Sequence, residues 1–355
     1  MSRYLIKKYK ALEPYIPGEQ PQDMRYVKLN TNESPFPPSP AVVKALSAAE
    51  VKKLRLYSDP EARALTRAIA DYYGISEAQV LCGNGSDEIL AFIYTAFSDK
   101  ENGMIYPEIS YGFYPVFSAL IGEPPCSVPL KEDYTVDVDE YLGRGKHVVI
   151  ANPNAPTGIC LSLTDIERLA EKNAGRLVIV DEAYIDFGGE SAIPLLKKYE
   201  NLIVVQTFSK SRSLAGARLG FCAASEEIIA DLKKIKYSFN PYNVNRLTAL
   251  AGKAAIEDTE YFGKCVAEII RVREFTVEEL KKLGFTVLPS KANFIFAGHA
   301  DKDGKRLYEE LKARGVLVRY FDKERLRGFV RITIGSKKDM KTLIQTVKEG
   351  MDNPR

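Results

Sequence analysis

Histidine is scarce in this chain, and its cysteines do not have the number or spacing of a disulfide framework. The 355 residues include only His147 and His299, so a His-rich metal site or a Ser-His-Asp triad is disfavoured, and we expect no bound metal. The 5 cysteines are odd in number and scattered, with no CxxC pair, which indicates reduced thiols in a cytosolic protein. Any chemistry must therefore use other side chains or a cofactor.

The chain also lacks a strong charge imbalance and any long apolar run. Its 50 Lys and Arg against 47 Asp and Glu give a formal net charge of +3, and no basic block stands out, so we expect no nucleic-acid partner. No apolar run approaches membrane-spanning length, and the apolar segment near the start is too short for a signal peptide. These absences predict a cytoplasmic protein with no membrane partner.

Short apolar runs alternate with helical patterns through the middle of the chain. Such runs are typical of buried parallel strands in an α/β sheet. Beyond about residue 235 the sequence pattern changes, and a long helical stretch is followed by short strands and helices. This order predicts a second, smaller α+β domain. The apolar runs are QVLC, MIYP, HVVIAN, RLVIVDEAY and LIVVQTF, and the helical patterns between them include EARALTRAIADYYG and TDIERLAEKNA.

Polar side chains follow several of these apolar runs. Asp181 follows the apolar residues of RLVIVDEAY, Asn152 and Asn154 follow those of HVVIAN, and Lys210 comes two residues after LIVVQTF. Each could be a cap or a solvated strand end, but ligands of open α/β sheets bind outside the carboxyl ends of strands. The turn CGNG also leads into a helix that begins at Ser86 or Asp87, where free amides suit a phosphate as well as an ordinary cap.

A lysine, a carboxylate and a phosphate site, without histidine or metal, fit the chemistry of pyridoxal phosphate. A lysine amine forms a Schiff base with the cofactor aldehyde, and an aspartate keeps the pyridine nitrogen protonated so that the ring accepts electrons. An arginine holds the phosphate through paired hydrogen bonds. The lysine, once released, is the natural acid and base for moving a proton between carbon atoms.

The motifs NPNAPTG, DEAYIDF and FSKSRSLAGARLG, in this order and spacing, resemble those of the fold-type I, class II aminotransferases, and most of all the histidinol-phosphate aminotransferases. LEPYIPG, LNTNESPF, RLYSDP, GNGSDEIL, KANFIF and FVRITIG also look like that family, so the resemblance spans nearly the whole chain. It implies an N-terminal arm over 1–30, and a large cofactor-binding α/β domain over 31–245 with a mostly parallel seven-stranded sheet. A small α+β domain over 246–355 would follow.

The resemblance also assigns roles in binding the cofactor. Lys210 is similar to the Schiff-base lysine, Asp181 to the partner of the pyridine nitrogen, and Tyr184 to a partner of the ring oxygen. Tyr111 resembles the aromatic residue that stacks on the ring, and Tyr57 a tyrosine that reaches the phosphate in a neighbouring subunit, which implies a homodimer. The residues that resemble the phosphate shell are Gly85, Ser86, Asp87, Thr207, Ser209 and Arg218.

The motif NPNAPTG departs from the family pattern at one position. The usual run has two asparagines before Pro-Thr-Gly, and the second contacts the ring oxygen. Here Ala155 occupies that second place. The contact either moves to Asn154 or is lost, and we expect it to move to Asn154.

The resemblance further suggests how a substrate is held. Arg331 in FVRITIG resembles the arginine that grips a substrate carboxylate, and a guanidinium fork suits a phosphate ester equally well. Tyr15, Glu33 and Arg319 resemble helpers at the far end of the substrate. The implied reaction moves an amino group between L-histidinol phosphate and 2-oxoglutarate or glutamate, in histidine biosynthesis.

Three alternatives remain open at this level. The same scaffold could serve an aminotransferase for aromatic amino acids or a decarboxylase of phosphothreonine. A cofactor-binding module that regulates transcription is disfavoured, because it would need a basic DNA-binding segment, and none stands out.

The assignment of Lys210 generates a first prediction. Purified protein should be yellow, and borohydride should trap a covalent bond between the protein and the cofactor, because the reactive amine belongs to Lys210. Lys210→Ala should fold but yield no trapped bond, measured by the mass of the intact protein after reduction. A trapped bond in that variant would show that another amine carries the cofactor.

Overall fold

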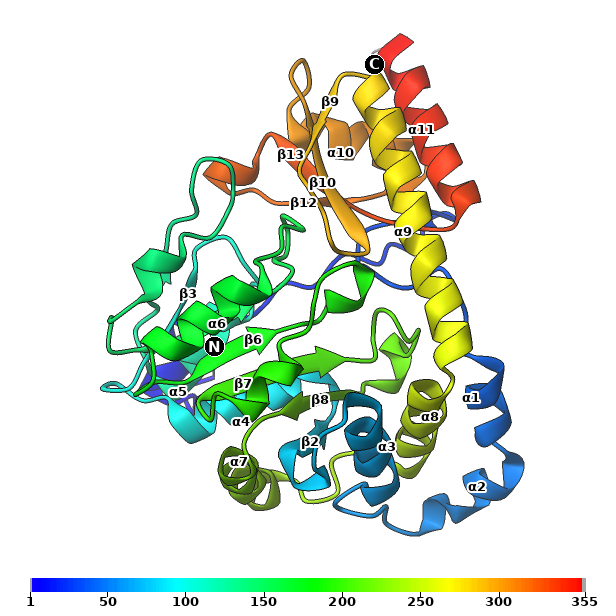
Figure 1. The fold of residues 1–355 in the computed structure, drawn as a ribbon. Coiled ribbons are helices and arrows are strands. Elements are labelled where there is room, and N and C mark those ends of the chain that lie inside the picture. Colours follow the sequence, from blue (N-terminus) through cyan, green and yellow to red (C-terminus); the bar gives the residue numbers. More distant parts are fainter. Residues whose placement is uncertain (1, 353–355) are drawn as a thin grey trace.

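A seven-stranded sheet forms the centre of the computed structural model, which describes residues 2–352 (Figure 1). The strand order is β2-β8-β7-β6-β5-β3-β4, and only β8 runs antiparallel to its neighbours. The mostly parallel seven-stranded sheet predicted from the sequence is therefore confirmed. The strands are β2 (Val80–Gly83), β3 (Met104–Pro107), β4 (Ser127–Val128), β5 (His147–Ala151), β6 (Val178–Asp181), β7 (Leu202–Thr207) and β8 (Gly220–Ala223).

Helices bury both faces of this sheet. Along β6, Val178 and Val180 belong to one hydrophobic core and Ile179 to the other, because successive side chains of a strand point to opposite faces. Burial on both sides explains why these strands read as continuous apolar runs. One face packs against α3 (Arg63–Tyr73), α6 (Leu163–Lys172) and α8 (Arg246–Glu257), and the other against α4 (Gly85–Phe97), α5 (Tyr114–Ile121) and α7 (Glu226–Phe239).

Local sequence signals mark the ends of these helices. Ser162 begins α6 with a capping box, in which its side chain accepts from the Asp165 amide and the Asp165 carboxylate accepts in return. Helix α3 ends at Gly74, whose φ of 65° lies in the left-handed region that favours glycine. The two helical patterns quoted from the sequence thus correspond to α3 and α6.

A second, antiparallel sheet lies above the first in Figure 1, in the order β12-β13-β10-β9. Its core also includes residues of α9 and α11, and the long helix α9 runs from beside α8 up to this sheet. The elements are α9 (Thr259–Lys282), β9 (Phe285–Val287), β10 (Phe294–His299), α10 (Gly304–Ala313), β12 (Arg319–Tyr320), β13 (Phe329–Thr333) and α11 (Lys337–Asp352).

The predicted division at residue 245 falls just before α8. Ala251, Ala255 and Ile256 of that helix are buried in the core of the seven-stranded sheet. This packing favours a boundary between α8 and α9 rather than before α8, and the division into 31–245 and 246–355 stays a prediction.

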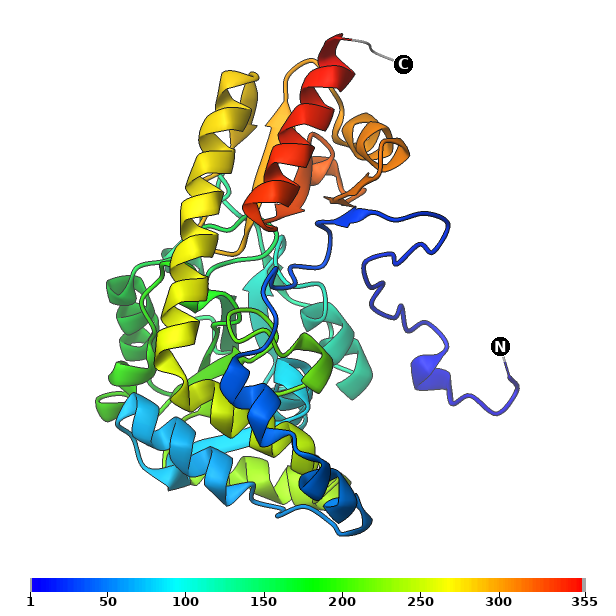
Figure 2. The ribbon, with the colours of Figure 1, turned by 90° about the vertical axis from the view of Figure 1, so that its right-hand side faces the viewer.

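The N-terminal segment lies as extended chain along the outside of the body (Figure 2). It joins the rest through β1 (Val27–Lys28), which pairs in parallel with β11 (Val316–Leu317). Two short helices follow, α1 (Pro40–Ala45) and α2 (Ala48–Lys52). Short 3-10 helices are Lys7–Tyr9, Lys53–Arg55, Glu77–Gln79, Val138–Tyr141, Ile185–Phe187, Ile193–Lys197, Ala215–Ala217 and Glu324–Leu326. Across residues 2–352, none of the helices has the length and apolar character needed to cross a membrane.

Gly220 generates a prediction about the close approach of β8 to the start of α4. A Cβ atom at this position would lie 2.5 Å from the backbone nitrogen of Ser86 and 2.6 Å from the carbonyl carbon of Gly85. Gly220→Ala should therefore lower the free energy of unfolding by about 1–3 kcal/mol, the cost of overpacking. The exposed Gly263 within α9 meets nothing within 4 Å and is the matched control. Gly263→Ala should raise stability by about 0.5–1 kcal/mol, as helix propensity predicts. Equal effects in urea unfolding would contradict the crowding at Gly220.

Candidate active site

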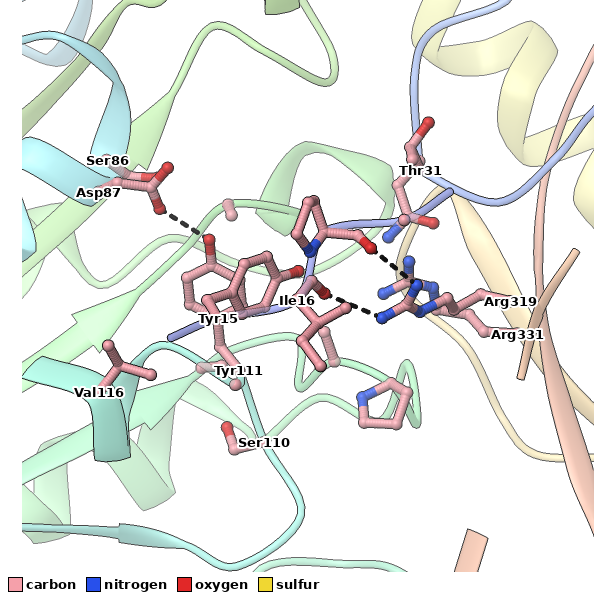
Figure 3. Close-up of a pocket in the computed structure, with 18 of the residues that line it drawn as sticks. Tyr15, Ile16, Thr31, Ser86, Asp87, Ser110, Tyr111, Val116, Arg319 and Arg331 are labelled. Atoms are coloured by element: carbon pink, nitrogen blue, oxygen red, sulfur yellow. Dashed lines mark hydrogen bonds between the residues drawn. The ribbon is translucent and has the colours of Figure 1, made fainter. Parts of the chain in front are cut away.

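A cavity of about 840 Å³ opens where the carboxyl ends of β5, β6 and β7 meet the start of α4 (Figure 3). Ala151, Asp181 and Thr207, the last residues of the three strands, line it. This is the place where an open α/β sheet binds its ligands. The residues expected from the sequence that line the cavity are Tyr15, Glu33, Ser86, Asp87, Tyr111, Asp181, Tyr184, Thr207, Ser209, Lys210, Arg218, Arg319 and Arg331.

Three expected residues are absent from the lining of this cavity as the described residues form it. Gly85 is the first residue of α4 and adjoins the lining residue Ser86. Tyr57 is 80% exposed and stacks on Tyr242, with ring centroids 4.5 Å apart, which leaves it free to meet another molecule. The third is Asn154.

The side chain of Asn154 is buried and already occupied. Its Nδ2 donates to the Ile109 carbonyl at 2.9 Å and to Thr157 Oγ1 at 3.2 Å, and its Oδ1 accepts from Ser110 Oγ at 2.8 Å. Ala155, which has no polar side chain, lines the cavity instead. A contact from Asn154 to the ring oxygen would require these hydrogen bonds to break, so the geometry does not favour the predicted move from position 155.

The start of α4 lies beside Arg218, and the two together could hold an anion. The first amides of a helix lack intrahelical acceptors, and the helix dipole adds positive potential there. Arg218 Nη2 donates to Asp87 Oδ2 at 3.2 Å, and a Cβ atom at Gly85 would lie 2.7 Å from the same nitrogen. Glycine at 85, with φ of 80°, therefore lets the guanidinium approach the helix start. Thr207 and Ser209 also line the cavity, and their hydroxyl oxygens lie 3.0 Å apart.

Asp181 lies deep in the cavity at the end of β6. Its Oδ2 accepts from the Tyr114 hydroxyl at 3.0 Å, and its Oδ1 accepts from the Ala183 amide at 3.2 Å. Burial raises the pKa of Asp181 to about 6, and these two hydrogen bonds act in the opposite direction. A cationic ligand group beside this carboxylate would relieve the cost of its burial.

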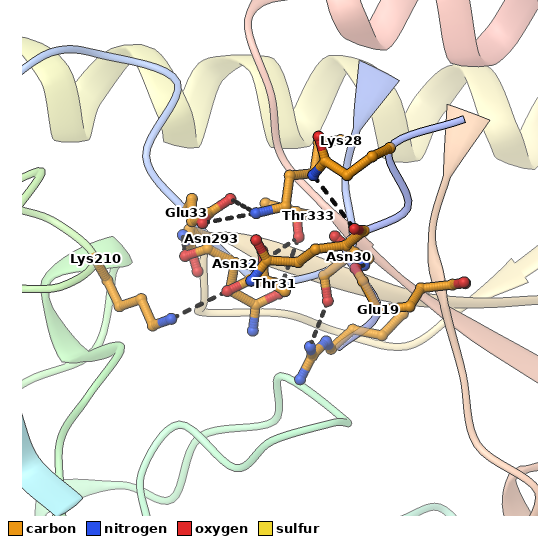
Figure 4. Close-up of polar contacts among 12 residues, drawn as sticks. Glu19, Lys28, Asn30, Thr31, Asn32, Glu33, Lys210, Asn293 and Thr333 are labelled. Atoms are coloured by element: carbon orange, nitrogen blue, oxygen red, sulfur yellow. Dashed lines mark hydrogen bonds and ion pairs between the residues drawn. The ribbon is translucent and has the colours of Figure 1, made fainter. Parts of the chain in front are cut away.

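Lys210 follows β7 and points its amine toward the N-terminal segment (Figure 4). The Nζ atom donates to the Thr31 carbonyl at 3.2 Å and lies 5.8 Å from the centre of the Tyr184 ring. Burial lowers the pKa of Lys210 to about 8, and the nearby Arg331 adds to the effect. The amine is therefore partly neutral, and nucleophilic, near physiological pH.

Two tyrosines are held by polar partners at the cavity wall. The Tyr111 hydroxyl donates to Asp87 Oδ1 at 2.7 Å (Figure 3). The Tyr184 hydroxyl accepts from Asn32 Nδ2 at 3.0 Å, and its ring meets Phe294 edge to face with centroids 5.0 Å apart. Both rings are thus fixed in orientation at the cavity wall.

The opposite wall carries two arginines. Arg331 Nη2 donates to the Asn30 carbonyl at 3.0 Å, whereas its inaccessible Nε has no hydrogen-bond partner among residues 2–352. Arg319 donates to the carbonyls of Ile16 and Pro17 in the N-terminal segment, at 3.0 and 3.1 Å (Figure 3).

The two remaining residues expected to help the substrate lie along the N-terminal segment. Tyr15 stacks on Phe113 with ring centroids 4.3 Å apart. Glu33 is exposed and forms an ion pair with Lys28 at 2.6 Å, so part of its negative charge is compensated before any ligand arrives.

Sequence reasoning missed two residues that organise this site. Tyr114 donates to Asp181, and Asn32 donates to Tyr184. Asn32 lies within LNTNESPF and Tyr114 lies three residues after Tyr111, but nothing local marks either residue as a partner of a distant side chain.

The donor set fits pyridoxal phosphate on chemical grounds. One cavity combines an amine with a lowered pKa, a buried carboxylate, a helix start beside Arg218 and a second arginine, Arg331, whose Nε lacks a partner within the described chain. These groups match, in turn, an aldehyde, a protonated pyridine nitrogen, a phosphate and an anionic substrate. The arrangement suits transfer of an amino group.

Comparisons with known proteins agree with this chemistry. Residues 25–347 match the family described as aminotransferase class I and II. The histidinol-phosphate aminotransferase of Brachyspira hyodysenteriae is 50% identical over 349 residues, which cover 98% of this chain and 99% of that protein. The enzyme of the same name from Acinetobacter baumannii is 48% identical over 350 residues, which cover 98% of this chain and 97% of the relative.

Solved structures show the same fold. The histidinol-phosphate aminotransferase of Sinorhizobium meliloti, in complex with pyridoxal-5'-phosphate, has a TM-score of 0.82 at 25% identity and covers 92% of this chain and 90% of its own. That of Clostridium acetobutylicum has a TM-score of 0.84 at 24% identity and covers 92% of this chain and 99% of its own. The fold-type I architecture and the resemblance found in the sequence are confirmed, and the chain belongs to the class I and II aminotransferases and, within them, to the histidinol-phosphate aminotransferase family.

Proposed function

We propose that this aminotransferase moves an amino group between L-histidinol phosphate and 2-oxoglutarate or glutamate, with pyridoxal phosphate as its cofactor. The observation that carries the proposal is Arg331, whose Nε is buried without a partner among the described residues at a wall of the cavity that holds Lys210. A buried donor of this kind calls for an anionic acceptor. Both substrates offer one, a phosphate ester in the first and carboxylates in the second, and the names of the relatives favour histidinol phosphate as the first.

Different residues of the cavity would bind different groups of the cofactor. Bound pyridoxal phosphate supplies an aldehyde that takes the amino group and a ring that accepts electrons. The amides at the start of α4, Ser209 and Arg218 would hold its phosphate, since these donors line one cavity and a helix start favours anions. Asp181 would hold the proton on the pyridine nitrogen, and Tyr184 would donate to the ring oxygen.

Lys210 would both carry the cofactor and move the substrate proton. Its pKa of about 8 leaves part of the amine free to accept a proton at its Nζ near neutral pH, whereas an exposed lysine would stay almost fully charged. Tyr15 and Arg319 line the cavity, and Arg319 holds the carbonyl of Ile16 next to Tyr15, so this part of the N-terminal segment would help to exclude water from the substrate.

A homodimer is the second part of the proposal. The exposed Tyr57 stacks on Tyr242, and the exposed Leu54 and Leu56 precede it. Neighbouring exposed apolar side chains favour a protein partner, and a second copy would place Tyr57 beside the neighbouring phosphate site, as the family resemblance implies. A cytoplasmic location also belongs to the proposal, supported by cysteines that are all free.

Asp181 generates a prediction that separates stability from activity. Burial raises the pKa of Asp181 from 3.8 to about 6, so the folded, cofactor-free protein binds a proton there more tightly than the unfolded chain does. That protein loses stability as pH rises from about 4 to about 6, by about 3 kcal/mol at most. Cofactor-free Asp181→Asn should therefore be more stable than the unchanged protein at pH 8, by about 1–3 kcal/mol in urea unfolding, with a smaller difference at pH 5.

The same variant should lose turnover by orders of magnitude once cofactor is added, because an amide does not stabilise the proton on the pyridine nitrogen. Near-normal turnover, or a stability difference that is the same at both pH values, would return Asp181 to a purely structural role.

Arg331 generates the prediction that decides the substrate. Arg331→Ala should weaken binding of both glutamate and histidinol phosphate by about 2–5 kcal/mol, the scale of truncating one partner of a buried charge pair. Tyr15→Phe is the comparison variant, and it should affect mainly the phosphorylated substrate. Apparent affinities for both substrates come from single-turnover loss of the absorbance of the bound aldehyde.

In the unchanged enzyme, histidinol phosphate should convert the bound aldehyde far faster than phenylalanine does, and phosphothreonine should release no carbon dioxide. Equal rates for histidinol phosphate and phenylalanine would favour an aromatic aminotransferase. Release of carbon dioxide would overturn the transaminase assignment.

A further inference from the structure

Asn32 connects the two sheets, because its side chain is hydrogen-bonded to Thr333 on β13 of one sheet (Figure 4) and to Tyr184 just after β6 of the other. It is 1% exposed, and its φ of 57° lies in the left-handed region, which asparagine tolerates better than most residues but glycine tolerates best. The neighbouring Thr31 carbonyl accepts from Lys210 at 3.2 Å, and the Asn30 carbonyl accepts from Arg331 at 3.0 Å. Asn32 thus lies in a backbone segment that touches both ends of the active site.

Hydrogen bonds fix the orientation of the Asn32 side chain. Its backbone amide donates to Thr333 Oγ1 at 2.9 Å, and the Thr333 hydroxyl in turn donates to Asn32 Oδ1 at 3.0 Å. Asn293 Nδ2 donates to the Asn32 carbonyl at 3.0 Å. Because Thr333 engages the amide oxygen, the amide nitrogen faces Tyr184, and it donates to the Tyr184 hydroxyl at 3.0 Å.

This direction determines where the proton of Tyr184 points. A phenol that accepts a hydrogen bond keeps its own proton for another acceptor. Within residues 2–352 the hydrogen bond from Asn32 is the one found at this oxygen, and Tyr184 lines the cavity. Ala155 belongs to the apolar cluster against which Tyr184 packs, and its side chain can offer no hydrogen bond. The amide that holds Tyr184 therefore comes from position 32, far from the NPNAPTG motif in the sequence.

We propose that Asn32 is a positioning residue, whose amide holds the Tyr184 hydroxyl so that its proton is donated into the cavity toward the cofactor. The bonds to Thr333 extend this role to the second sheet. Thr333 and Arg331 are two residues apart on β13, so their side chains share a face of that strand. Asn32 thereby links the tyrosine at the cofactor to the strand that presents the substrate arginine. The inference rests on the proposed function, which supplies the acceptor for the Tyr184 proton.

The competing explanation is that asparagine is present only because the backbone needs a positive φ. Asn32→Gly separates the two, since glycine adopts this φ without strain and removes only the side chain. If the backbone alone mattered, that variant would behave as the unchanged enzyme does.

The test is a double-mutant cycle with Tyr184→Phe in the holoenzyme. Two quantities are measured for each protein, the pH midpoint of the absorbance of bound pyridoxal phosphate and the single-turnover rate with histidinol phosphate. Asn32→Gly should raise the midpoint by about 0.5 pH unit or more and slow the turnover by about five- to tenfold, the size expected for one lost hydrogen bond. Negative charge on the ring oxygen is then less stabilised, which accounts for the upward direction.

In the Tyr184→Phe background, Asn32→Gly should change neither quantity by more than about twofold in rate or 0.2 pH unit, because the hydroxyl through which it acts is gone. Equal changes in both backgrounds, or no change in the unchanged background, would overturn the proposal. Thr333→Val is the second variant should Asn32→Gly fail to fold. It releases the amide oxygen of Asn32 and should shift the midpoint in the same direction, again only when Tyr184 is present.

The design also distinguishes this inference from the proposed substrate. If histidinol phosphate is not converted by the unchanged enzyme, the proposed function fails, while the absorbance midpoints still decide the role of Asn32. If conversion is normal but the cycle shows no coupling, the role of Asn32 alone is overturned.

Discussion

An amine that must react near neutral pH has to be taken out of water, and the position of Lys210 meets this constraint. Burial and the nearby Arg331 lower the pKa of Lys210 to about 8. Both effects need the carboxyl end of β7 and the strand β13 of the other sheet to lie on one cavity. The chemistry of the site therefore depends on how the two sheets are held together, as much as on the lysine itself.

The polar segment just before Glu33 makes that connection. Carbonyls of Asn30 and Thr31 accept from Arg331 and Lys210, and Asn32 bonds to Thr333 and Tyr184. A single stretch of backbone thus touches the cofactor end, the substrate end and the second sheet. The carbonyls of this segment and the Asn32 side chain are paired with side chains from both sheets, which limits the alternative arrangements of the cavity wall.

Other groups in the cavity lower the stability of the empty protein and are suited to a ligand. Asp181 is a buried carboxylate without a cationic partner among the described residues, and Arg331 Nε has no acceptor there. Each lowers the stability of the folded protein until a ligand binds, a cation beside Asp181 or an anion beside Arg331. Active sites commonly lose stability in this way for the sake of function. Bound cofactor and substrate should therefore stabilise the fold as well as react.

The sequence by itself determined the features that arise from neighbouring residues. Apolar runs between helical patterns indicated a mostly parallel sheet, and the polar residues after those runs indicated that Asp181 and Lys210 lie at one edge of it. The resemblance to the family added Tyr184. Contacts between distant segments were decided only by the tertiary structure. The NPNAPTG motif suggested that Asn154 replaces the amide lost at Ala155, but Asn154 is engaged by Ile109, Ser110 and Thr157, and the amide that reaches Tyr184 comes from Asn32. The physical reason is that a hydrogen bond depends on distance and direction in space, and a local pattern carries neither for residues 152 positions apart.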